Sequence, residues 1–324
     1  MFISVFFRPV FFALLCCLAA GGLRAQQLAQ KFVQETHYLL YLPEGYEKDT
    51  AARWPLVLFL HGSGESGTDL QKVKAHGPPE LVEKGRNFPF IVVSPQSYVP
   101  SGWDVAALHK LLLHIKQAYR VDQDRVYATG LSMGGFGTWE LAMKYPGEFA
   151  AIAPVCGGGD TANAWKFRNV PVWCFHGARD EVVLPQSSRN MVNAAKKFNP
   201  SVRFTLYPEA DHNSWDSAYN GNALYDWLLS HKRHRYKEVQ LPLQSLKRYE
   251  GHYLGPDGDT VQIVTGDKGL LAKPGRNTVQ LKAAGENLFF LQEELPLDIR
   301  FLYTGKAVSG LLFLGDRKLE YRKL

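Results

Sequence analysis

The sequence predicts an α/β fold with a doubly wound, mostly parallel sheet, followed by a small antiparallel all-β domain. Between residues 55 and 231, short apolar runs alternate with helix-length amphipathic segments, and strands joined by helices in this way form parallel βαβ units. Beyond residue 241 the runs are short, alternate in polarity and are separated by Gly, Asp, Asn and Pro, as antiparallel strands are. We therefore expect an α/β domain over 26–232, a basic linker over 233–240 and a β domain over 241–324.

Residues 1–25 have the pattern of a signal peptide. The stretch up to Leu23 is almost entirely apolar, Arg8 is its one charged residue, and small Ala25 closes the segment. Its uninterrupted apolar part, from Val10 to Leu23, is shorter than the ~20 residues that a membrane span needs. We expect cleavage after Ala25 and export, to the periplasm or as a secreted protein, with no membrane span after cleavage; an uncleaved anchor is the alternative.

Composition excludes several classes of function. Loss of Arg8 and Arg24 with the signal peptide lowers the formal net charge from +6 to +4, and no stripe of Lys and Arg alternates with aromatic residues, so nucleic acid is not an expected partner.

The mature chain keeps Cys156 and Cys174 in apolar runs, where free buried thiols are common, although an exported protein could pair them. The sequence has no CxxC or HExxH motif and no His/Cys cluster, so neither a metal nor another cofactor is expected.

The elements of the α/β domain follow in order. The run from Phe32 to Leu42 alternates and stops at Pro43, which favours an antiparallel edge strand. Residues 55–60 are apolar throughout, as in a strand that is covered on both faces. Further strands are expected at 88–94, 125–129, 149–155, 170–175 and 202–207, and helices at 68–85, 104–119, 133–145, 184–198 and 222–231.

The C-terminal runs are too short and too regularly alternating for helices. They indicate an antiparallel sheet or a small barrel. The expected strands cover 261–264, 269–273, 278–282, 288–292, 299–303, 310–314 and 319–322.

A Gly-x-Ser-x-Gly motif spans Gly130 to Gly134, with Ser132 at its centre. A β-branched and aromatic run precedes it and helix-forming residues follow, so Ser132 is predicted at the apex of a sharp strand-to-helix turn, a nucleophile elbow. The two glycines suit a turn that leaves no room for side chains. Because the pentapeptide alone is weak evidence, its interpretation depends on partners elsewhere in the chain.

A serine nucleophile needs a base, and the base needs an orienting acid. We predict Asp180 as the acid, since it closely follows an expected strand, with Glu181 as its rival. We predict His212 as the base, since it follows the last expected strand; His61 and His176 each precede a glycine at a strand end and suit a role in loop structure. The chain order Ser, acid, His is that of the α/β hydrolases.

The same strand ends offer the other parts of a site. We predict that the N–H groups of Met133 and Ser63 form an oxyanion hole, because one follows the nucleophile and the other lies in a glycine-rich loop. Gln96, Trp103 and Trp215 are candidate substrate-binding residues, and the two indoles could stack on a sugar or a phenyl ring or only pack the rim.

Several motifs together resemble a known family. They include Leu60-His-Gly-Ser-Gly, Ser94-Pro-Gln, the segment from Gly130 to Trp139, His176-Gly and Asp211-His-Asn-Ser-Trp. From Phe32 to Lys232 the chain resembles the phospholipase/carboxylesterase and dienelactone-hydrolase-like branch of the α/β hydrolases, which includes exported feruloyl and acetylxylan esterases and predicted peptidases. Dienelactone hydrolases use a cysteine nucleophile. Because this chain has Ser132 at that position, the resemblance does not imply that it shares their substrate. The C-terminal part looks like the small β domains of exported bacterial serine hydrolases.

These observations predict an exported serine carboxylesterase that hydrolyses carboxylic esters, such as feruloyl or acetyl esters of plant polysaccharides, through an acyl-enzyme. The expected partner is a small-molecule or glycan-linked ester, and the β domain would contact a glycan or a protein. Two alternatives remain: a serine peptidase on short peptides, and a surface binding protein with a vestigial hydrolase core.

Overall fold

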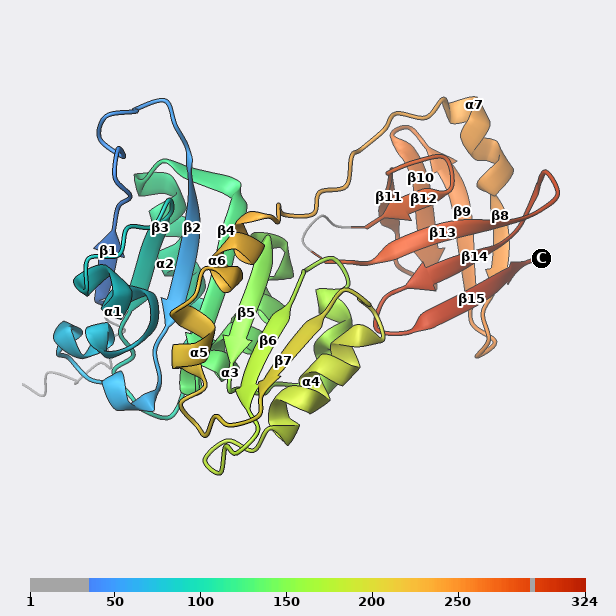
Figure 1. The fold of residues 1–324 in the computed structure, drawn as a ribbon. Helices are drawn as coiled ribbons and strands as arrows, with labels where there is room; N and C mark the ends of the chain where they lie inside the picture. The colour runs from blue at the N-terminus through green and yellow to red at the C-terminus, as the bar shows by residue number, and fades with distance from the viewer. Residues whose placement is uncertain (1–34, 292–294) are drawn as a thin grey trace, which may run out of the picture. The chain divides into compact units, whose positions relative to one another are not determined.

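The computed structural model describes residues 35–291 and 295–324, so the predicted signal peptide lies outside it. A seven-stranded sheet in the order β1-β3-β2-β4-β5-β6-β7 forms the centre of the α/β part (Figure 1). Its strands are β1 (Tyr38–Tyr41), β2 (Trp54–Leu60), β3 (Ile91–Pro95), β4 (Val121–Leu131), β5 (Ala151–Val155), β6 (Trp173–Gly177) and β7 (Arg203–Tyr207). Only β1 runs antiparallel to its neighbour, which confirms the predicted edge strand and mostly parallel sheet.

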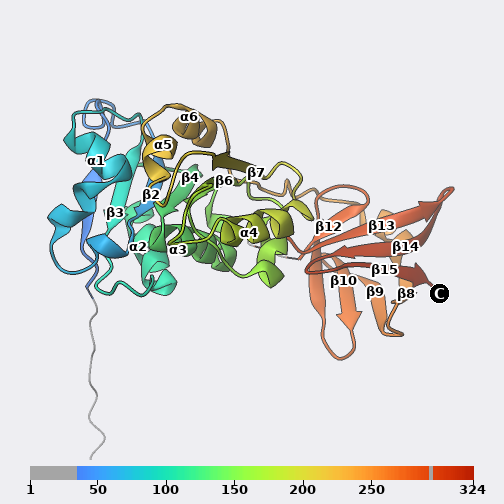
Figure 2. The same ribbon diagram turned by 60° about the horizontal axis from the view of Figure 1, so that its bottom comes forward.

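Helices cover both faces of this sheet (Figure 2). Leu56 and Leu58 of β2 point to the face covered by α2 (Val105–Ala118), α3 (Met133–Lys144) and α4 (Gln186–Lys196), whereas Val57 and Phe59 point to the other. That face is covered by α1 (Gly77–Glu83), α5 (Trp215–Tyr219) and α6 (Ala223–Leu229). Successive side chains of a strand point to opposite faces, so a continuously apolar run such as β2 fills both cores.

One predicted helix is broken in the structure. Residues 68–85 were expected to form a single helix, but they form a 3₁₀ helix, η2 (Leu70–Ala75), followed by α1. Gly77 has a φ of +68°, a conformation that suits glycine and interrupts helical geometry. Pro78 and Pro79 then occupy the first turn of α1, where their missing N–H groups cost nothing.

The C-terminal part is a closed antiparallel barrel in the order β10-β11-β12-β13-β14-β15-β8-β9. After α7 (Leu243–Leu246) it contains β8 (Gly251–Leu254), β9 (Thr260–Gly266), β10 (Gly269–Pro274), β11 (Val279–Ala283), β12 (Leu288–Phe290), β13 (Asp298–Thr304), β14 (Ala307–Leu314) and β15 (Lys318–Lys323). Aromatic side chains fill its core, among them Tyr249, Tyr253, Phe289 and Phe301. All seven predicted runs are strands; β8, which closes the barrel by pairing with β15, was not predicted.

None of the helices in the described ranges is both long and apolar enough to span a bilayer.

Candidate active site

Ser132 lies in the sharp turn between β4 and α3, at the carboxyl end of a central strand. Its φ of +52° and ψ of −117° are rare for a residue with a side chain. The turn is tight because the backbone of Gly134 lies against β2: a Cβ on Gly134 would be 1.9 Å from the Leu60 carbonyl oxygen. The glycines of the motif therefore permit close packing, as predicted, and leave the Ser132 side chain at the turn's apex.

Asp180 follows β6 on the loop that leads to α4, and its side chain is buried, at 2% exposure. Its Oδ1 accepts the backbone N–H groups of Val182 and Val183, each at 2.9 Å. Burial alone would raise the pKa of this carboxyl, but the hydrogen bonds from His212 and from these N–H groups outweigh it, so the pKa lies below its ordinary value. The neighbouring Glu181 is exposed.

His212 follows β7 and joins the other two predicted residues. Its Nδ1 donates to Asp180 Oδ2 at 2.8 Å, and its Nε2 lies 3.0 Å from Ser132 Oγ, close enough to accept the hydroxyl proton. The carboxylate can only accept, so it sets the tautomer with the proton on Nδ1. The end of β6 packs directly against this loop, because a Cβ on Gly177 would lie 2.1 Å from the Asp211 carbonyl oxygen. The three side chains thus form a continuous hydrogen-bonded chain, which we call the relay.

The predicted oxyanion donors belong to the helix that follows the nucleophile and to the loop that follows β2. Met133 opens α3, and the first N–H groups of a helix have no partner within it. Ser63 begins the 3₁₀ helix η1 (Ser63–Glu65) after β2, and the preceding Gly62 lies beside Ser132, with 3.7 Å between a Cβ built on Gly62 and that of Ser132. Glu65 Oε2 accepts the Gly62 N–H at 2.8 Å. This buried contact holds the loop against the nucleophile.

His61 and Gln96 stabilise the same loops. His61 Nε2 accepts the backbone N–H of Ser97 at 3.0 Å, and burial lowers the pKa of the imidazole despite its bond to the Gly62 carbonyl and the nearby Glu65. Gln96 is 3% exposed, and its Nε2 donates to the carbonyls of Glu65 and Asp69, both at 2.8 Å. The amide nitrogen of this predicted substrate-binding residue is thus occupied by the loop.

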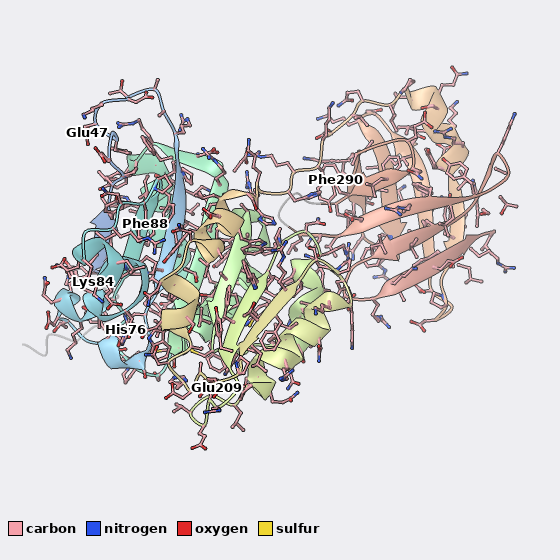
Figure 3. The ribbon with its side chains drawn as sticks, viewed as in Figure 1. Glu47, His76, Lys84, Phe88, Glu209 and Phe290 are labelled. Carbon is pink, nitrogen blue, oxygen red and sulfur yellow. The ribbon has the colours of Figure 1, made fainter. Side chains whose placement is uncertain are left out.

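The two predicted tryptophans pack against the cores on opposite faces of the sheet. The ring of Trp103 is centred 4.7 Å from that of His61, and that of Trp215 lies edge-on to His212 at 5.2 Å. Trp215 also contacts His76, at 5.3 Å between centroids. In Figure 3 the labelled side chains of His76 and Glu209 lie on the side of the sheet where the parallel strands have their carboxyl ends. Contact of either indole with a substrate remains a prediction.

An open groove of about 420 Å³ begins one helical turn after the nucleophile. Its lining residues are Phe136, Glu140, Met143, Lys144, Gly158, Gly159, Asp160, Asn163 and Lys166. The ring of Phe136 is 39% exposed. Ligand sites in proteins have volumes from about 300 Å³ upwards, so this groove is large enough for part of a substrate.

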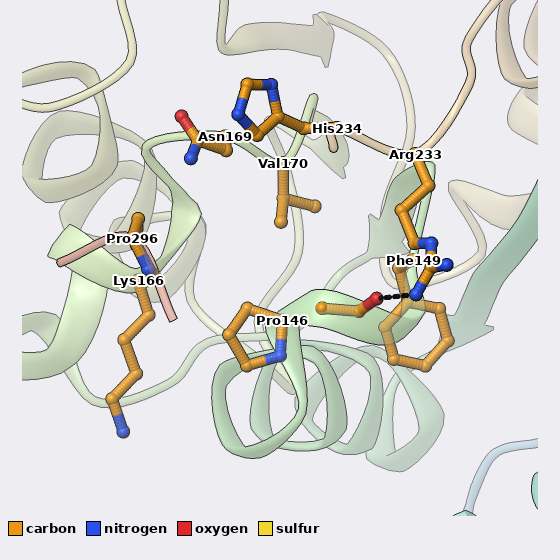
Figure 4. A pocket seen from close by; sticks show the side chains of 9 residues that line it. Pro146, Phe149, Lys166, Asn169, Val170, Arg233, His234 and Pro296 are labelled. Atoms are coloured by element: carbon orange, nitrogen blue, oxygen red, sulfur yellow. Dashed lines mark hydrogen bonds between the residues drawn. The ribbon is translucent and has the colours of Figure 1, made fainter. Parts of the chain in front are cut away.

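A second cavity, shown in Figure 4, is of another kind. Its volume is about 20 Å³, room for about one water molecule. Arg233 crosses it to donate to the Gly147 carbonyl at 2.8 Å. A cavity of this size has no room for a substrate, so it is no candidate for the reaction.

Two groups of side chains in the described ranges have ligand atoms within 4.8 Å of one another, the spacing of a metal site. One contains Cys156 and two members of the relay, so its atoms are already engaged. The other, His76, Glu80 and Asp216, lies at α1 and α5. Glu80 there is paired with Lys84, and we assign no metal to it.

The sequence did not indicate that Cys156 contacts the turn that carries Ser132. The thiol lies directly below the elbow, and the backbone N–H of Ser132 donates to its Sγ at 3.2 Å and to the Val155 carbonyl at 3.1 Å. Cys156 itself has a φ of +41°. Nothing in the spacing of the sequence marks this contact, since the two residues are 24 positions apart.

Cys156 and Cys174 are free and fully buried, which decides between the two alternatives that the sequence left open. Burial raises the pKa of each thiol to about 12, so at about pH 8 roughly one thiol in 10⁴ is ionised. We expect the native mature chain to resist the thiol reagent DTNB, and two thiols per chain to react in concentrated guanidinium chloride. Rapid modification of one thiol in the native protein would contradict this packing.

The chain is similar to several known esterases. Residues 103–224 match the model of the dienelactone hydrolase family. The chain is similar to a bifunctional acetylxylan esterase/xylanase of Neocallimastix patriciarum, 30% identical over 183 residues, which cover 53% of this chain and 26% of that protein. It is also similar to a probable feruloyl esterase C of Aspergillus terreus, 28% identical over 162 residues, which cover 48% of this chain and 59% of that one.

A crystal structure of a thermostable esterase is 32% identical, with a TM-score of 0.53, and covers 61% of this chain and 60% of the esterase. The fold of the α/β part is that of the α/β hydrolases. The chain spans 26% and 59% of the length of the two curated relatives, so the activities in their names describe those proteins.

Proposed function

We propose that this chain is an exported serine carboxylesterase, in agreement with the match of residues 103–224 to the dienelactone hydrolase family model. The observation that carries the proposal is the continuous relay from Ser132 Oγ through His212 to the buried carboxylate of Asp180. Such a relay turns a weakly nucleophilic hydroxyl into one that attacks a carbonyl carbon. Export is proposed on the pattern of residues 1–25.

Ser132 and His212 act in both half-reactions, in which the enzyme is first acylated and then deacylated. His212 Nε2 takes the Ser132 proton as Oγ bonds to the ester carbonyl carbon, and the carbonyl π electrons move to its oxygen. The N–H groups of Met133 and Ser63 would stabilise that oxyanion. When the tetrahedral intermediate collapses, the alcohol leaves with the proton from His212. His212 then deprotonates a water molecule, which attacks the carbonyl carbon of the acyl-enzyme. As this second tetrahedral intermediate collapses, His212 returns the proton to Ser132 Oγ and the carboxylic acid leaves.

We propose feruloyl or acetyl esters of plant polysaccharides as the substrate class. The names of the two curated relatives support this substrate class. The lining of the groove also supports it, because it combines the exposed Phe136 with polar side chains such as Glu140 and Asn163. A sugar ester offers both apolar and hydroxyl surface to such a lining. The glycan or protein contact of the β domain, and the domain boundaries at 232 and 241, remain predictions.

A substrate panel tests this proposal. The mature chain, residues 26–324, would be assayed with p-nitrophenyl acetate and butyrate, methyl ferulate, acetylated xylan and chromogenic peptide amides. We expect turnover of the esters, and faster turnover of the feruloyl or acetylated-sugar substrates than of plain alkyl esters. Faster cleavage of amides than of esters would favour a peptidase. Failure of a fluorophosphonate probe to label Ser132 would favour a binding protein with a vestigial core.

A further inference from the structure

His176 is a buried histidine that the proposed reaction does not use. It is the last residue of β6 before Gly177 and is 0% exposed. Its ring packs against Asp180, the acid of the relay. Its Nε2 is 3.1 Å from Asp180 Oδ2 and 2.8 Å from the Val183 carbonyl oxygen. The same Asp180 Oδ2 accepts His212 Nδ1 at 2.8 Å.

The hydrogen-bond inventory determines the tautomer of His176. Both atoms that face Nε2 are acceptors, the carbonyl oxygen of Val183 and the carboxylate oxygen of Asp180, so Nε2 carries a proton. Burial lowers the pKa of this imidazole, although Val183 and Asp180 both act to raise it. The ring is therefore neutral and leaves a lone pair on Nδ1.

Ser188 on α4 continues the network from the other side of the ring. Its Oγ is 2.7 Å from His176 Nδ1 and 2.7 Å from the Gly157 carbonyl oxygen, and Ser188 is 0% exposed. Its single hydroxyl proton is shared between these two acceptors. The backbone of Gly157 in turn lies against α3, since a Cβ there would be 2.5 Å from the carbonyl carbon of Gly135.

We propose that His176 is a positioning residue for the relay. The buried chain of contacts from Asp180 through His176 and Ser188 to Gly157 joins the loop of the acid to the helix that carries the nucleophile. The N–H groups of Val182 and Val183 bond to Oδ1, His212 Nδ1 bonds to Oδ2, and His176 Nε2 lies 3.1 Å from Oδ2, so four nitrogen atoms surround the Asp180 carboxylate. A carboxylate held in this way cannot rotate, so it keeps His212 aligned with Ser132.

Two amide variants separate positioning from simple packing. Glutamine places its amide nitrogen near the position of Nε2, whereas asparagine reaches only to the position of Nδ1, so His176→Gln keeps a donor for Asp180 and His176→Asn does not. We expect His176→Asn to lower kcat for p-nitrophenyl butyrate about 10- to 100-fold with KM nearly unchanged, because a small misplacement of a reacting group costs that much. His176→Gln should stay within about 5-fold of the wild type.

This inference rests on the proposed esterase function, and a measurement without turnover separates the two. In ¹H NMR spectra of the intact mature chain with ¹⁵N-labelled histidine, the proton between His212 and Asp180 should give a downfield signal. We expect this signal in the wild type and in His176→Gln, and its shift or loss in His176→Asn. An inactive wild type with this pattern would overturn the esterase and leave His176 as a positioning residue.

Two results would overturn the role of His176. One is an unchanged signal and unchanged kcat in His176→Asn. The other is an equal loss in both amide variants together with a lower Tm and a lower fraction of Ser132 labelled by a fluorophosphonate probe, since that pattern is the one expected of packing alone. Ser188→Ala provides a second arm: it removes the bridge to Gly157 and should lower kcat in the same direction as His176→Asn, by a smaller factor.

Discussion

Replacing Ser132 by alanine is expected to lower kcat for ester hydrolysis by roughly a millionfold. The variant loses the Oγ that His212 Nε2 approaches at 3.0 Å, and no acyl-enzyme can then form. The backbone at this position is already strained, with a φ of +52°, and alanine bears that strain as serine does, so the fold should remain. Steady-state hydrolysis of p-nitrophenyl butyrate and labelling by a fluorophosphonate probe measure the loss.

Ser101→Ala is a matched control for this variant. Ser101 is exposed on the loop between β3 and α2, so its loss should leave kcat and labelling unchanged. Retention of more than about 1% of wild-type kcat by Ser132→Ala would refute the assignment, because such activity exceeds what binding and the oxyanion donors supply alone. Labelling that persists in Ser132→Ala would place the nucleophile on another residue.

The relay was accessible to prediction because each of its residues follows a recognisable strand. The glycines around Ser132 mark a turn without side chains, and Asp180 and His212 each follow an apolar run of strand length. The carboxyl ends of parallel strands meet at one edge of a sheet. The parallel direction of the strands therefore brings the three residues near one another, although they are up to 80 positions apart.

The supporting contacts were not accessible in the same way. Cys156 meets the elbow through tertiary packing that no local pattern encodes, whereas Glu65 makes a local contact, three residues after Gly62. His176 was predicted to serve loop structure, whereas in the structure its Nε2 lies 3.1 Å from Asp180 Oδ2. The closure of the barrel depends on the pairing of β8 with β15, which is a matter of register between distant segments. Local propensity also failed at Gly77, where a positive φ divides the predicted helix.

Asp180→Asn is expected to lower kcat by about 10³- to 10⁴-fold. Two backbone N–H groups, from Val182 and Val183, point at Oδ1, so the new amide must place its oxygen there. Its NH₂ group then faces His212 Nδ1 and donates to it. This fixes the opposite tautomer, with the proton on Nε2, where it can no longer accept the Ser132 proton. Steady-state kinetics on p-nitrophenyl butyrate, with Glu181→Gln as the exposed neighbouring control, measure the effect.

The same substitution has a pH-dependent effect on stability whose direction follows from the pKa of Asp180. Hydrogen bonds hold this pKa below its ordinary value despite burial, so the carboxylate stabilises the fold above the unfolded pKa and loses this contribution as the pH falls through the folded one. Asparagine does not titrate. The Tm difference between wild type and Asp180→Asn should therefore be largest near neutral pH and shrink below about pH 4. A difference that grew on acidification would mean that Asp180 is protonated in the native protein, and it could not then orient His212 as an anion.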